Sequence, residues 1–344
     1  MLSIPTLRCV SRFIPRIPAH RRLVSALSYQ SIPMDEGTSL QSETRQQATN
    51  RLCYVSSFTT ELLEISSEHP LVHVLLIPGN PGVAAFYKDF VEAVYQLFEG
   101  NASVTAIGHI SQTKKNFEGR RLFSLQDQID HKVNFINQEL QNEKVPILLV
   151  GHSIGAYIAL EVFRRFPEQV IYTIGLYPFL TLNRKSLVQS ILVRVTASKI
   201  LTVAFCSILT FLGLLPNWFK RILVKRFVGQ SCSTSTIGAT CSHLLQYSTM
   251  QNVLYMAMTE FRKLSEQPDW AFFRANQTQL AFLFGINDHW GPLTLYEEIS
   301  KHAPDLPLTI EREGHTHAFC CTEAGSIWVA HYVVGLIKNR LALG

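Results

Sequence analysis

A strand-like run, a glycine-containing turn and an amphipathic helix follow one another without interruption near the middle of the chain. Val145–Val150 is almost entirely apolar, and the residues GHSIG (151–155) follow it directly. From Ile154 to Phe166 apolar residues recur at helical spacing, and Pro167 then ends the helix. A buried strand that leads straight into a helix fits the doubly wound α/β class, in which helices join mostly parallel strands.

The same alternation extends over most of the chain. Helical periodicity covers Ala85–Phe98. Only 17% of the residues are charged and the mean hydropathy is +0.12, which excludes a disordered chain or a coiled coil. No run reaches 18 apolar residues, so we expect no ordinary membrane-spanning helix. Further apolar runs typical of buried parallel strands lie at Val72–Ile77, Val170–Leu176 and Leu280–Phe284. Leu306–Glu311 is predicted to be the last strand.

About a hundred residues between the runs at 170–176 and 280–284 break this alternation and predict an apolar helical insertion. Residues 181–275, called the cap segment below, are therefore expected to interrupt the α/β core. The core itself is predicted in two parts, residues 51–180 and 276–344. Residues 1–50 are predicted to be a basic leader and a polar linker, disordered or cleaved.

The charge of the chain is unevenly distributed. Residues 1–34 contain five arginines and no acidic residue, which is typical of an organellar transit peptide; a disordered basic tail, with Met34 as an internal start, is the alternative. The remaining 26 basic residues balance the 26 acidic residues, so a nucleic-acid partner is not expected. The seven cysteines lack CxxC spacing and are expected to be free thiols rather than a disulfide or zinc framework.

The cap segment contains a candidate lipid-surface anchor. Residues 200–215 carry no charge, and as a helix they reach about 24 Å, short of the roughly 30 Å of a bilayer core. In the next segment Trp218 and Phe219 stand beside Lys220 and Arg221, a pattern typical of a helix that lies in the headgroup plane. The alternative is a buried cap helix that covers an acyl pocket.

Ser153 is the candidate nucleophile. In a G-x-S-x-G turn between a strand and a helix, the serine occupies a strained position, and only glycine fits at Gly151 and Gly155. The N-terminus of the following helix stabilises developing negative charge. The alternative is an ordinary helix N-cap serine.

A serine nucleophile needs a base and a carboxylate, which follow it in the order acid then histidine in this type of fold. Asp288 comes just after the apolar run at 280–284, and His317 lies on a loop after the predicted last strand. A turn-capping role for Asp288 and His315 as the base are the alternatives. His152 is expected to pack against the elbow or tune it. The H-x-H pair lacks further metal ligands, so neither a metal nor a cofactor is expected.

An oxyanion hole requires two backbone N–H groups. Ile154, directly after the serine, supplies the first. The second is expected from the loop at residues 77–82, where Pro78 and Pro81 have no N–H and Asn80 is the natural donor. The alternative is a proline-glycine turn without a catalytic role.

Five elements in this order, PGNPG, AFY, GHSIGAY, GxxDxW and HAF, resemble the lipid droplet-associated hydrolases, a branch of the α/β-hydrolase superfamily, over roughly residues 70–335. The resemblance implies the α/β-hydrolase fold, the triad Ser153, Asp288 and His317, and an apolar cap that targets lipid droplets from the endoplasmic reticulum. The arginine-rich leader is not part of that family pattern, and a mitochondrion or plastid is the alternative compartment.

Together these features predict a serine ester hydrolase that cleaves neutral lipid esters, either sterol ester or acylglycerol, through an acyl-enzyme at the surface of a lipid droplet or the endoplasmic reticulum. One alternative is a weakly active or inactive protein of the same fold that binds or tethers lipid droplets. Another is acyl transfer to an alcohol, which would use the same residues.

Overall fold

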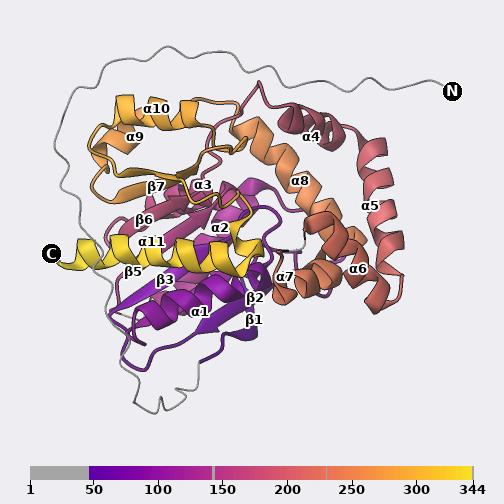
Figure 1. Cartoon of the computed structure of the whole chain (residues 1–344), viewed down its shortest axis with the longest axis horizontal. Helices are drawn as coiled ribbons and strands as arrows, with labels where there is room; N and C mark the ends of the chain where they lie inside the picture. The colour runs from indigo at the N-terminus through magenta and orange to yellow at the C-terminus, as the bar shows by residue number, and fades with distance from the viewer. Residues whose placement is uncertain (1–45, 142–143, 230, 343–344) are drawn as a thin grey trace. The chain divides into compact units, whose positions relative to one another are not determined.

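The computed structural model of the chain describes residues 46–141, 144–229 and 231–342. Their centre is an eight-stranded sheet with the strand order β1-β2-β4-β3-β5-β6-β7-β8 (Figure 1). Strands β1, β2 and β4 pair antiparallel, and all the other pairs are parallel. The strands are β1 (Thr49–Val55), β2 (Phe58–Ile65), β3 (Val72–Ile77), β4 (Ala102–Ile107), β5 (Ile147–His152), β6 (Val170–Leu176), β7 (Leu280–Gly285) and β8 (Leu308–Glu311).

The predicted parallel strands are confirmed, with small changes at their ends. Strands β3 and β6 have the predicted bounds, whereas β8 begins after Pro307, which has no N–H to donate to a neighbouring strand. Strand β1 begins at Thr49, two residues before the predicted start of the core, because Thr49 and Asn50 pair with β2. The predicted leader, residues 1–34, lies outside the described residues.

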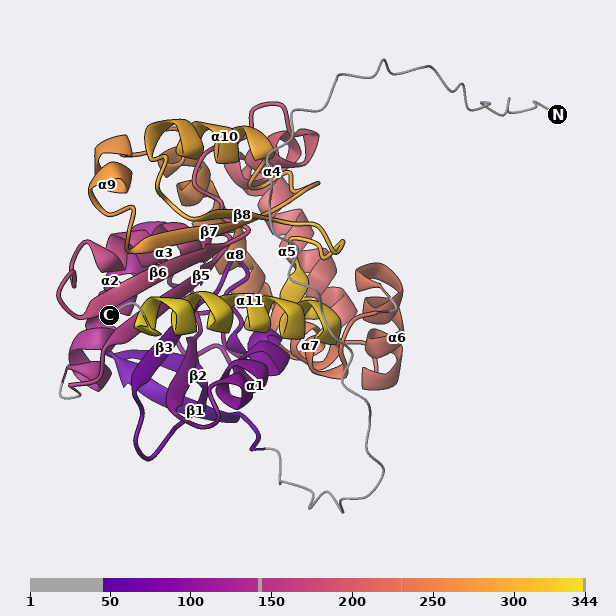
Figure 2. The ribbon, with the colours of Figure 1, turned by 60° about the vertical axis from the view of Figure 1, so that its left-hand side comes forward.

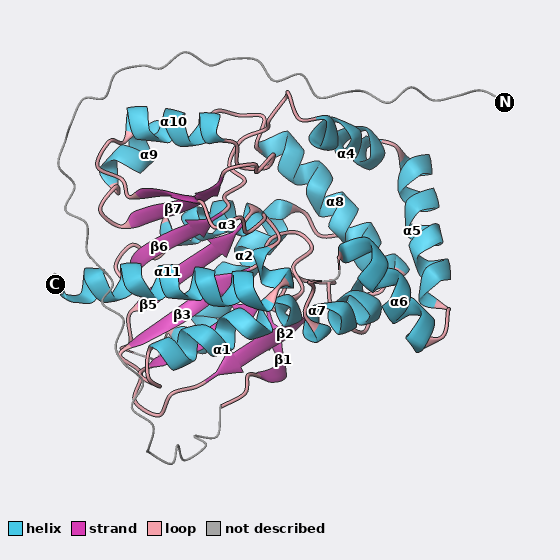
Figure 3. Cartoon of the chain, in the orientation of Figure 1, coloured by secondary structure: helices cyan, strands magenta, loops and turns pink. Residues whose placement is uncertain are grey.

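Helices cover both faces of the sheet (Figures 1 and 3). Helices α1 and α11 pack against each other on one face, while α2 and α3 pack on the other. The helices are α1 (Lys88–Leu97), α2 (Leu125–Phe135), α3 (Ile154–Phe163), α4 (Leu187–Ala197), α5 (Lys199–Gly213), α6 (Asn217–Val228), α7 (Thr234–Ala239), α8 (Tyr247–Lys263), α9 (Trp270–Ala275), α10 (Leu293–His302) and α11 (Glu323–Ala342), with 3-10 turns η1 (Ala84–Tyr87) and η4 (Phe319–Cys321) and π-helical turns η2 (Ile136–Leu140) and η3 (Thr240–Leu244).

The apolar runs form strands because both faces of the sheet are covered. Every residue of β3 and β5 is buried. Alternate residues of β3 enter two separate hydrophobic clusters: Leu76 packs with Phe90 of α1, and Leu75 packs with Ile158 of α3. This double burial fixes the carboxyl ends of β3 and β5 next to each other, where the candidate site residues follow.

The cap segment forms helices at one end of the sheet, as Figure 2 shows for α4 to α8. Helix α8 packs against α4 and α5 and also holds the segment to the core. The Asn252 Oδ1 accepts a hydrogen bond from the Phe123 N–H at 2.9 Å, and the Thr259 Oγ1 accepts one from the Leu125 N–H at 2.9 Å. Helix α8 is therefore one of the parts of the cap segment that hydrogen bonds to the core hold in place.

Helix α5 leaves most of its apolar side chains exposed. Cys206 is its one buried residue, and Phe211 is 68% exposed. This exposure contradicts the alternative of a buried cap helix. Among the described residues no single helix is long and apolar enough to cross a membrane, although α4 and α5, bent by 99° at their junction, pass that test as a pair.

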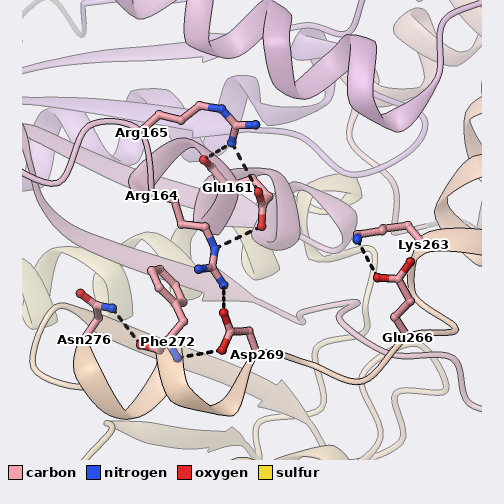
Figure 4. Close-up of polar contacts among 8 residues, drawn as sticks. All are labelled: Glu161, Arg164, Arg165, Lys263, Glu266, Asp269, Phe272 and Asn276. Carbon is pink, nitrogen blue, oxygen red and sulfur yellow. Dashed lines mark hydrogen bonds and ion pairs between the residues drawn. The ribbon is translucent and has the colours of Figure 1, made fainter.

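Polar contacts fasten the end of the cap segment to the outer end of α3 (Figure 4). The Arg164 guanidinium donates to the Asp269 carboxylate at 3.0 Å and lies over the Phe272 ring, 3.6 Å from its centroid. Asp269 also caps α9 by accepting from the Phe272 N–H. Exposed pairs of this kind add little stability, so they chiefly orient α9 where the chain returns to β7.

Candidate active site

Ser153 occupies a sharp turn between β5 and α3. Its φ of 56° lies in the left-handed region, which costs a non-glycine residue about 1–3 kcal/mol. The glycines on either side make this turn sterically possible. A Cβ at Gly155 would lie 2.2 Å from the Ile77 carbonyl oxygen, and one at Gly151 would lie 2.3 Å from the Gly155 carbonyl oxygen. No side chain fits at either position, as the sequence predicts.

The structure brings Ser153, His317 and Asp288 together from three loops. The Ser153 Oγ lies 2.9 Å from His317 Nε2, and His317 Nδ1 lies 2.7 Å from Asp288 Oδ2. Because the Asp288 carboxylate only accepts, Nδ1 carries the proton, and Nε2 then accepts from the serine hydroxyl. The three residues follow β5, β7 and β8, which are parallel neighbours in the sheet through β6.

Asp288 stays charged although its side chain is only 1% exposed. Burial raises the pKa of its carboxyl, but the hydrogen bond and charge of His317, together with the N–H groups of Trp290 and Gly291, outweigh burial. The pKa of Asp288 is therefore held below its ordinary value. A buried carboxylate of this kind can fix the His317 tautomer and stabilise its protonated form. Asp288 accepts from Trp290 at 2.9 Å, so it also has the turn-capping contact considered above.

The alternative base, His315, lies beside helix α11. Its ring packs near Trp328, with the ring centroids 5.6 Å apart. The geometry thus favours His317 over His315 as the partner of Ser153.

The loop after β3 lies directly against the serine turn. A Cβ added at Gly79 would lie 3.0 Å from the Ser153 Cβ, which places Gly79 beside Ser153. The Gly79 N–H donates to the Tyr87 hydroxyl at 3.1 Å and the Gly82 N–H to Gln112 Oε1 at 2.5 Å. The Asn80 N–H is the remaining donor of this loop. The Ile154 N–H begins α3 and has no carbonyl one turn earlier in that helix.

A second, buried chain of hydrogen bonds joins the same loops. Tyr87 Oη lies 2.7 Å from His152 Nδ1, and His152 Nε2 lies 2.9 Å from the His317 carbonyl oxygen. Because that carbonyl only accepts, Nε2 carries the proton and Nδ1 accepts from the tyrosine hydroxyl. Burial, followed by the charge of His317, lowers the pKa of His152 to about 3, so the ring is neutral. His152 thus joins the serine turn to the histidine loop.

Sequence reasoning missed three polar residues that hold the site. Tyr87 appears in the AFY element, but its role depends on His152, which is distant in sequence. Gln112 and Glu260 both contact the Asn80 side chain, and neither belongs to a recognisable motif. Among the described residues no group of three or more His, Cys, Asp or Glu side chains could hold a metal ion.

The candidate anchor residues lie on α6, in the cap segment. Trp218 is 66% exposed, and its ring packs edge-on against Phe219. Lys220 Nζ donates to the Gly213 carbonyl at 3.1 Å and so ties α6 to the end of α5. The Arg221 guanidinium lies beside Gly238 of α7. Trp218, Phe219 and Arg221 are exposed, and Lys220 is partly buried.

Several solved structures share this fold. The haloalkane dehalogenase DbeA from Bradyrhizobium elkani is similar with a TM-score of 0.65 and 15% identity, covering 86% of this chain and 100% of that one. An epoxide hydrolase from Vigna radiata is similar with a TM-score of 0.61 and 15% identity, covering 85% and 99%. At this identity the likeness establishes the α/β-hydrolase fold.

Sequence comparison identifies the family. The lipid droplet-associated hydrolase of Gallus gallus is 30% identical over 277 residues, 74% of this chain and 81% of the chicken protein. The protein of the same name from Dictyostelium discoideum is 27% identical over 76% of this chain and 86% of its own length. The model of the family described as lipid-droplet associated hydrolase matches residues 70–320. The chain therefore belongs to the lipid-droplet associated hydrolase family and is a hydrolase of the α/β-hydrolase type.

Proposed function

We propose that the protein is a serine hydrolase that cleaves a neutral lipid ester, either a sterol ester or an acylglycerol, at a lipid surface. The observation that carries the proposal is the pair of hydrogen bonds from Ser153 to His317 and from His317 to Asp288. A serine hydroxyl is a weak nucleophile until a base and an orienting carboxylate stand in this relation to it.

The reaction would proceed in two half-reactions. The Ser153 Oγ attacks the acyl carbon while His317 Nε2 takes the hydroxyl proton, and Asp288 stabilises the resulting imidazolium. Collapse of the tetrahedral intermediate breaks the ester bond, and the leaving alcohol takes the proton from His317. Water then gives a proton to His317 and attacks the acyl-enzyme, and collapse releases the acid as Ser153 regains its proton. No cofactor takes part in these steps.

The developing oxyanion would be bound by two backbone donors. The Ile154 N–H comes directly after the serine at the start of α3, and the Asn80 N–H belongs to the loop after β3 that lies against the serine turn. Donors fixed before the reaction stabilise charge that exists only in the transition state, and one such donor contributes about 100- to 1000-fold in rate.

An apolar wall beside His317 favours an apolar ester. The Trp290 ring centroid lies 6.0 Å from that of His317, and Trp290 stacks parallel to Phe261 of α8. Phe179, which follows β6, packs edge-on against Trp290 at 5.0 Å. Aromatic side chains from three separate segments thus meet next to the proposed base, and such surfaces favour apolar groups over water.

The exposed apolar face of α5 and α6 supports a lipid surface as the partner. Ile200, Phe211 and Phe227 are 81%, 68% and 84% exposed, and soluble monomers seldom expose large contiguous apolar patches. On α6, Trp218 and Phe219 stand beside Lys220 and Arg221, as in helices that lie in the headgroup plane. The relatives are named for lipid droplets, which favours the droplet surface, with the endoplasmic reticulum membrane as a second site. The comparisons give no support to a mitochondrion or plastid.

Two assays on the full chain test this function. On emulsified cholesteryl oleate or triolein, the wild type should release fatty acid and Ser153→Ala should release none, while both proteins float with the emulsion. A chain that lacks residues 200–227 should no longer float. Flotation without hydrolysis by the wild type would refute the enzyme and favour a tethering protein, and flotation of the deletion variant would refute the anchor.

A further inference from the structure

Glu260 of α8 is a buried carboxyl that contacts the loop after β3, residues 77–82, called the oxyanion loop below. It is 4% exposed, and its Oε1 accepts a hydrogen bond from Asn80 Nδ2 at 2.9 Å. Asn80 Nδ2 also donates to the Val253 carbonyl at 2.9 Å, two turns earlier in the same helix. Both hydrogen atoms of the Asn80 amide are therefore bound by the cap segment rather than by the core.

The other side of Asn80 is held by the core. Gln112, in the loop after β4, directs its Nε2 toward Asn80 Oδ1 at 3.4 Å, and its own Oε1 accepts from the Gly82 N–H. The long Asn80–Gln112 distance makes this the weaker contact. The two short bonds to α8 are thus the main restraint on the Asn80 side chain.

The backbone at Asn80 has few other restraints. Pro78 and Pro81 have no N–H, and the N–H groups of Gly79 and Gly82 are bound by Tyr87 and Gln112. The Asn80 peptide lies between these two fixed points. A change in how the side chain is held would therefore move the backbone N–H of Asn80, the proposed oxyanion donor.

The Glu260 carboxyl can play this part without placing a charge near the oxyanion. Burial raises its pKa to about 8, although the hydrogen bond from Asn80 lowers it, so the group is largely neutral at pH 7. Among the described residues no charged side chain on the neighbouring loops or helices adds to this shift. A neutral carboxyl accepts the hydrogen bond from Asn80 without repelling the oxyanion.

We propose that Glu260 is a positioning residue that acts from α8 through the Asn80 side chain to hold the Asn80 N–H in place for the oxyanion. This rests on the proposed ester hydrolysis and on the role of Asn80 in it. Helix α8 is tied to the core by Asn252 and Thr259, so it offers a fixed point from which to hold the loop. The cap segment would then contribute to the transition state as well as to lipid contact.

The test compares Glu260→Leu with Glu260→Gln on a short soluble ester such as p-nitrophenyl butyrate. The leucine cannot accept from Asn80, so kcat should fall about 10- to 100-fold while KM changes by less than about twofold, because the oxyanion exists only in the transition state. The glutamine Oε1 can still accept, and kcat should stay within about threefold of the wild type. Glu266→Leu is the matched control at a carboxyl whose side chain is 63% exposed.

Asn80→Ala provides the second line of evidence and should lower kcat as Glu260→Leu does. If Glu260 acts through Asn80, the double variant should be no slower than Asn80→Ala alone. Any of three results would overturn the proposal. They are losses of kcat that multiply in the double variant, a Glu260→Leu variant with wild-type kcat, and a Glu260→Gln variant as slow as Glu260→Leu. If Glu260→Leu does not fold, as judged by circular dichroism, wild-type kcat in Asn80→Ala would overturn it. Hydrolysis by Ser153→Ala at the wild-type rate would instead refute the proposed function, and the positioning role with it.

Discussion

Tyr87→Phe removes one buried hydroxyl that serves two groups of the site at once. The Tyr87 oxygen accepts from the Gly79 N–H at 3.1 Å and donates to His152 Nδ1 at 2.7 Å. Tyr87 is fully buried, and the hydroxyl leaves a space that phenylalanine does not fill. The variant should therefore leave a backbone donor and a ring acceptor without partners inside the protein.

The size of the effect follows from those two groups. A buried polar group without a partner costs about 1–3 kcal/mol, so the loss of two partners should lower the free energy of unfolding by about 2–6 kcal/mol. His152 also bonds the His317 carbonyl, and Gly79 precedes Asn80, so both the proposed base and the proposed oxyanion donor lose a fixed neighbour. Small displacements of catalytic groups can cost up to about 100-fold in rate, and we expect kcat to fall at least about 10-fold.

Urea denaturation followed by circular dichroism measures the first effect, and ester hydrolysis measures the second. Tyr54→Phe is the matched control, because Tyr54 is 73% exposed and should change the free energy of unfolding by less than about 0.5 kcal/mol. The reasoning would be refuted if Tyr87→Phe lowers the free energy of unfolding by less than about 1 kcal/mol and keeps wild-type kcat.

Three further predictions concern single residues. Gly155→Ala should prevent formation of the serine turn, because its Cβ would lie 2.2 Å from the Ile77 carbonyl oxygen; a soluble variant with the wild-type melting temperature would contradict this. Asp288→Asn should lower kcat about 10³- to 10⁴-fold with little change in KM, because an amide that donates to Nδ1 imposes the wrong tautomer on His317; steady-state kinetics decide. Burial raises the pKa of Glu260 from 4.5 to about 8, so the stability that this group contributes is complete below pH 4.5 and is lost as the pH rises through about 8. Between pH 5 and 9 the wild type should lose roughly 4 kcal/mol of unfolding free energy that Glu260→Gln does not lose. An equal pH dependence of the unfolding free energy in the two proteins would contradict this.

The sequence is most informative where the chain is buried on both sides. Strands β3, β5, β6 and β7 are continuous apolar runs because helices cover both faces of the sheet, and each was predicted within two residues. The antiparallel strands β1 and β2 at the edge carry charged residues such as the exposed Arg51 and the partly buried Glu64, so no such run marks them. Strand β4 was also missed, because Ala102–Ile107 contains small and polar residues.

The same distinction applies to the site. Ser153, Asp288 and His317 could be predicted because each follows a recognisable strand in a fixed chain order. Tyr87 and Glu260 could not, because their roles depend on partners 65 and 180 residues away. In the sequence no motif marks Glu260, although Val253 and Met256 share its helix face. Only the packing of α8 against the oxyanion loop shows that it bonds to Asn80.

The central claim is that Ser153 is an activated nucleophile with His317 as its base. Labelling of the full-length protein with a fluorophosphonate probe, followed by mass spectrometry of the modified peptide, tests it most directly. The wild type and His315→Gln should be labelled at Ser153, and Ser153→Ala and His317→Gln should not. An unlabelled but folded wild type, or labelling that depends on His315 instead of His317, would contradict the account.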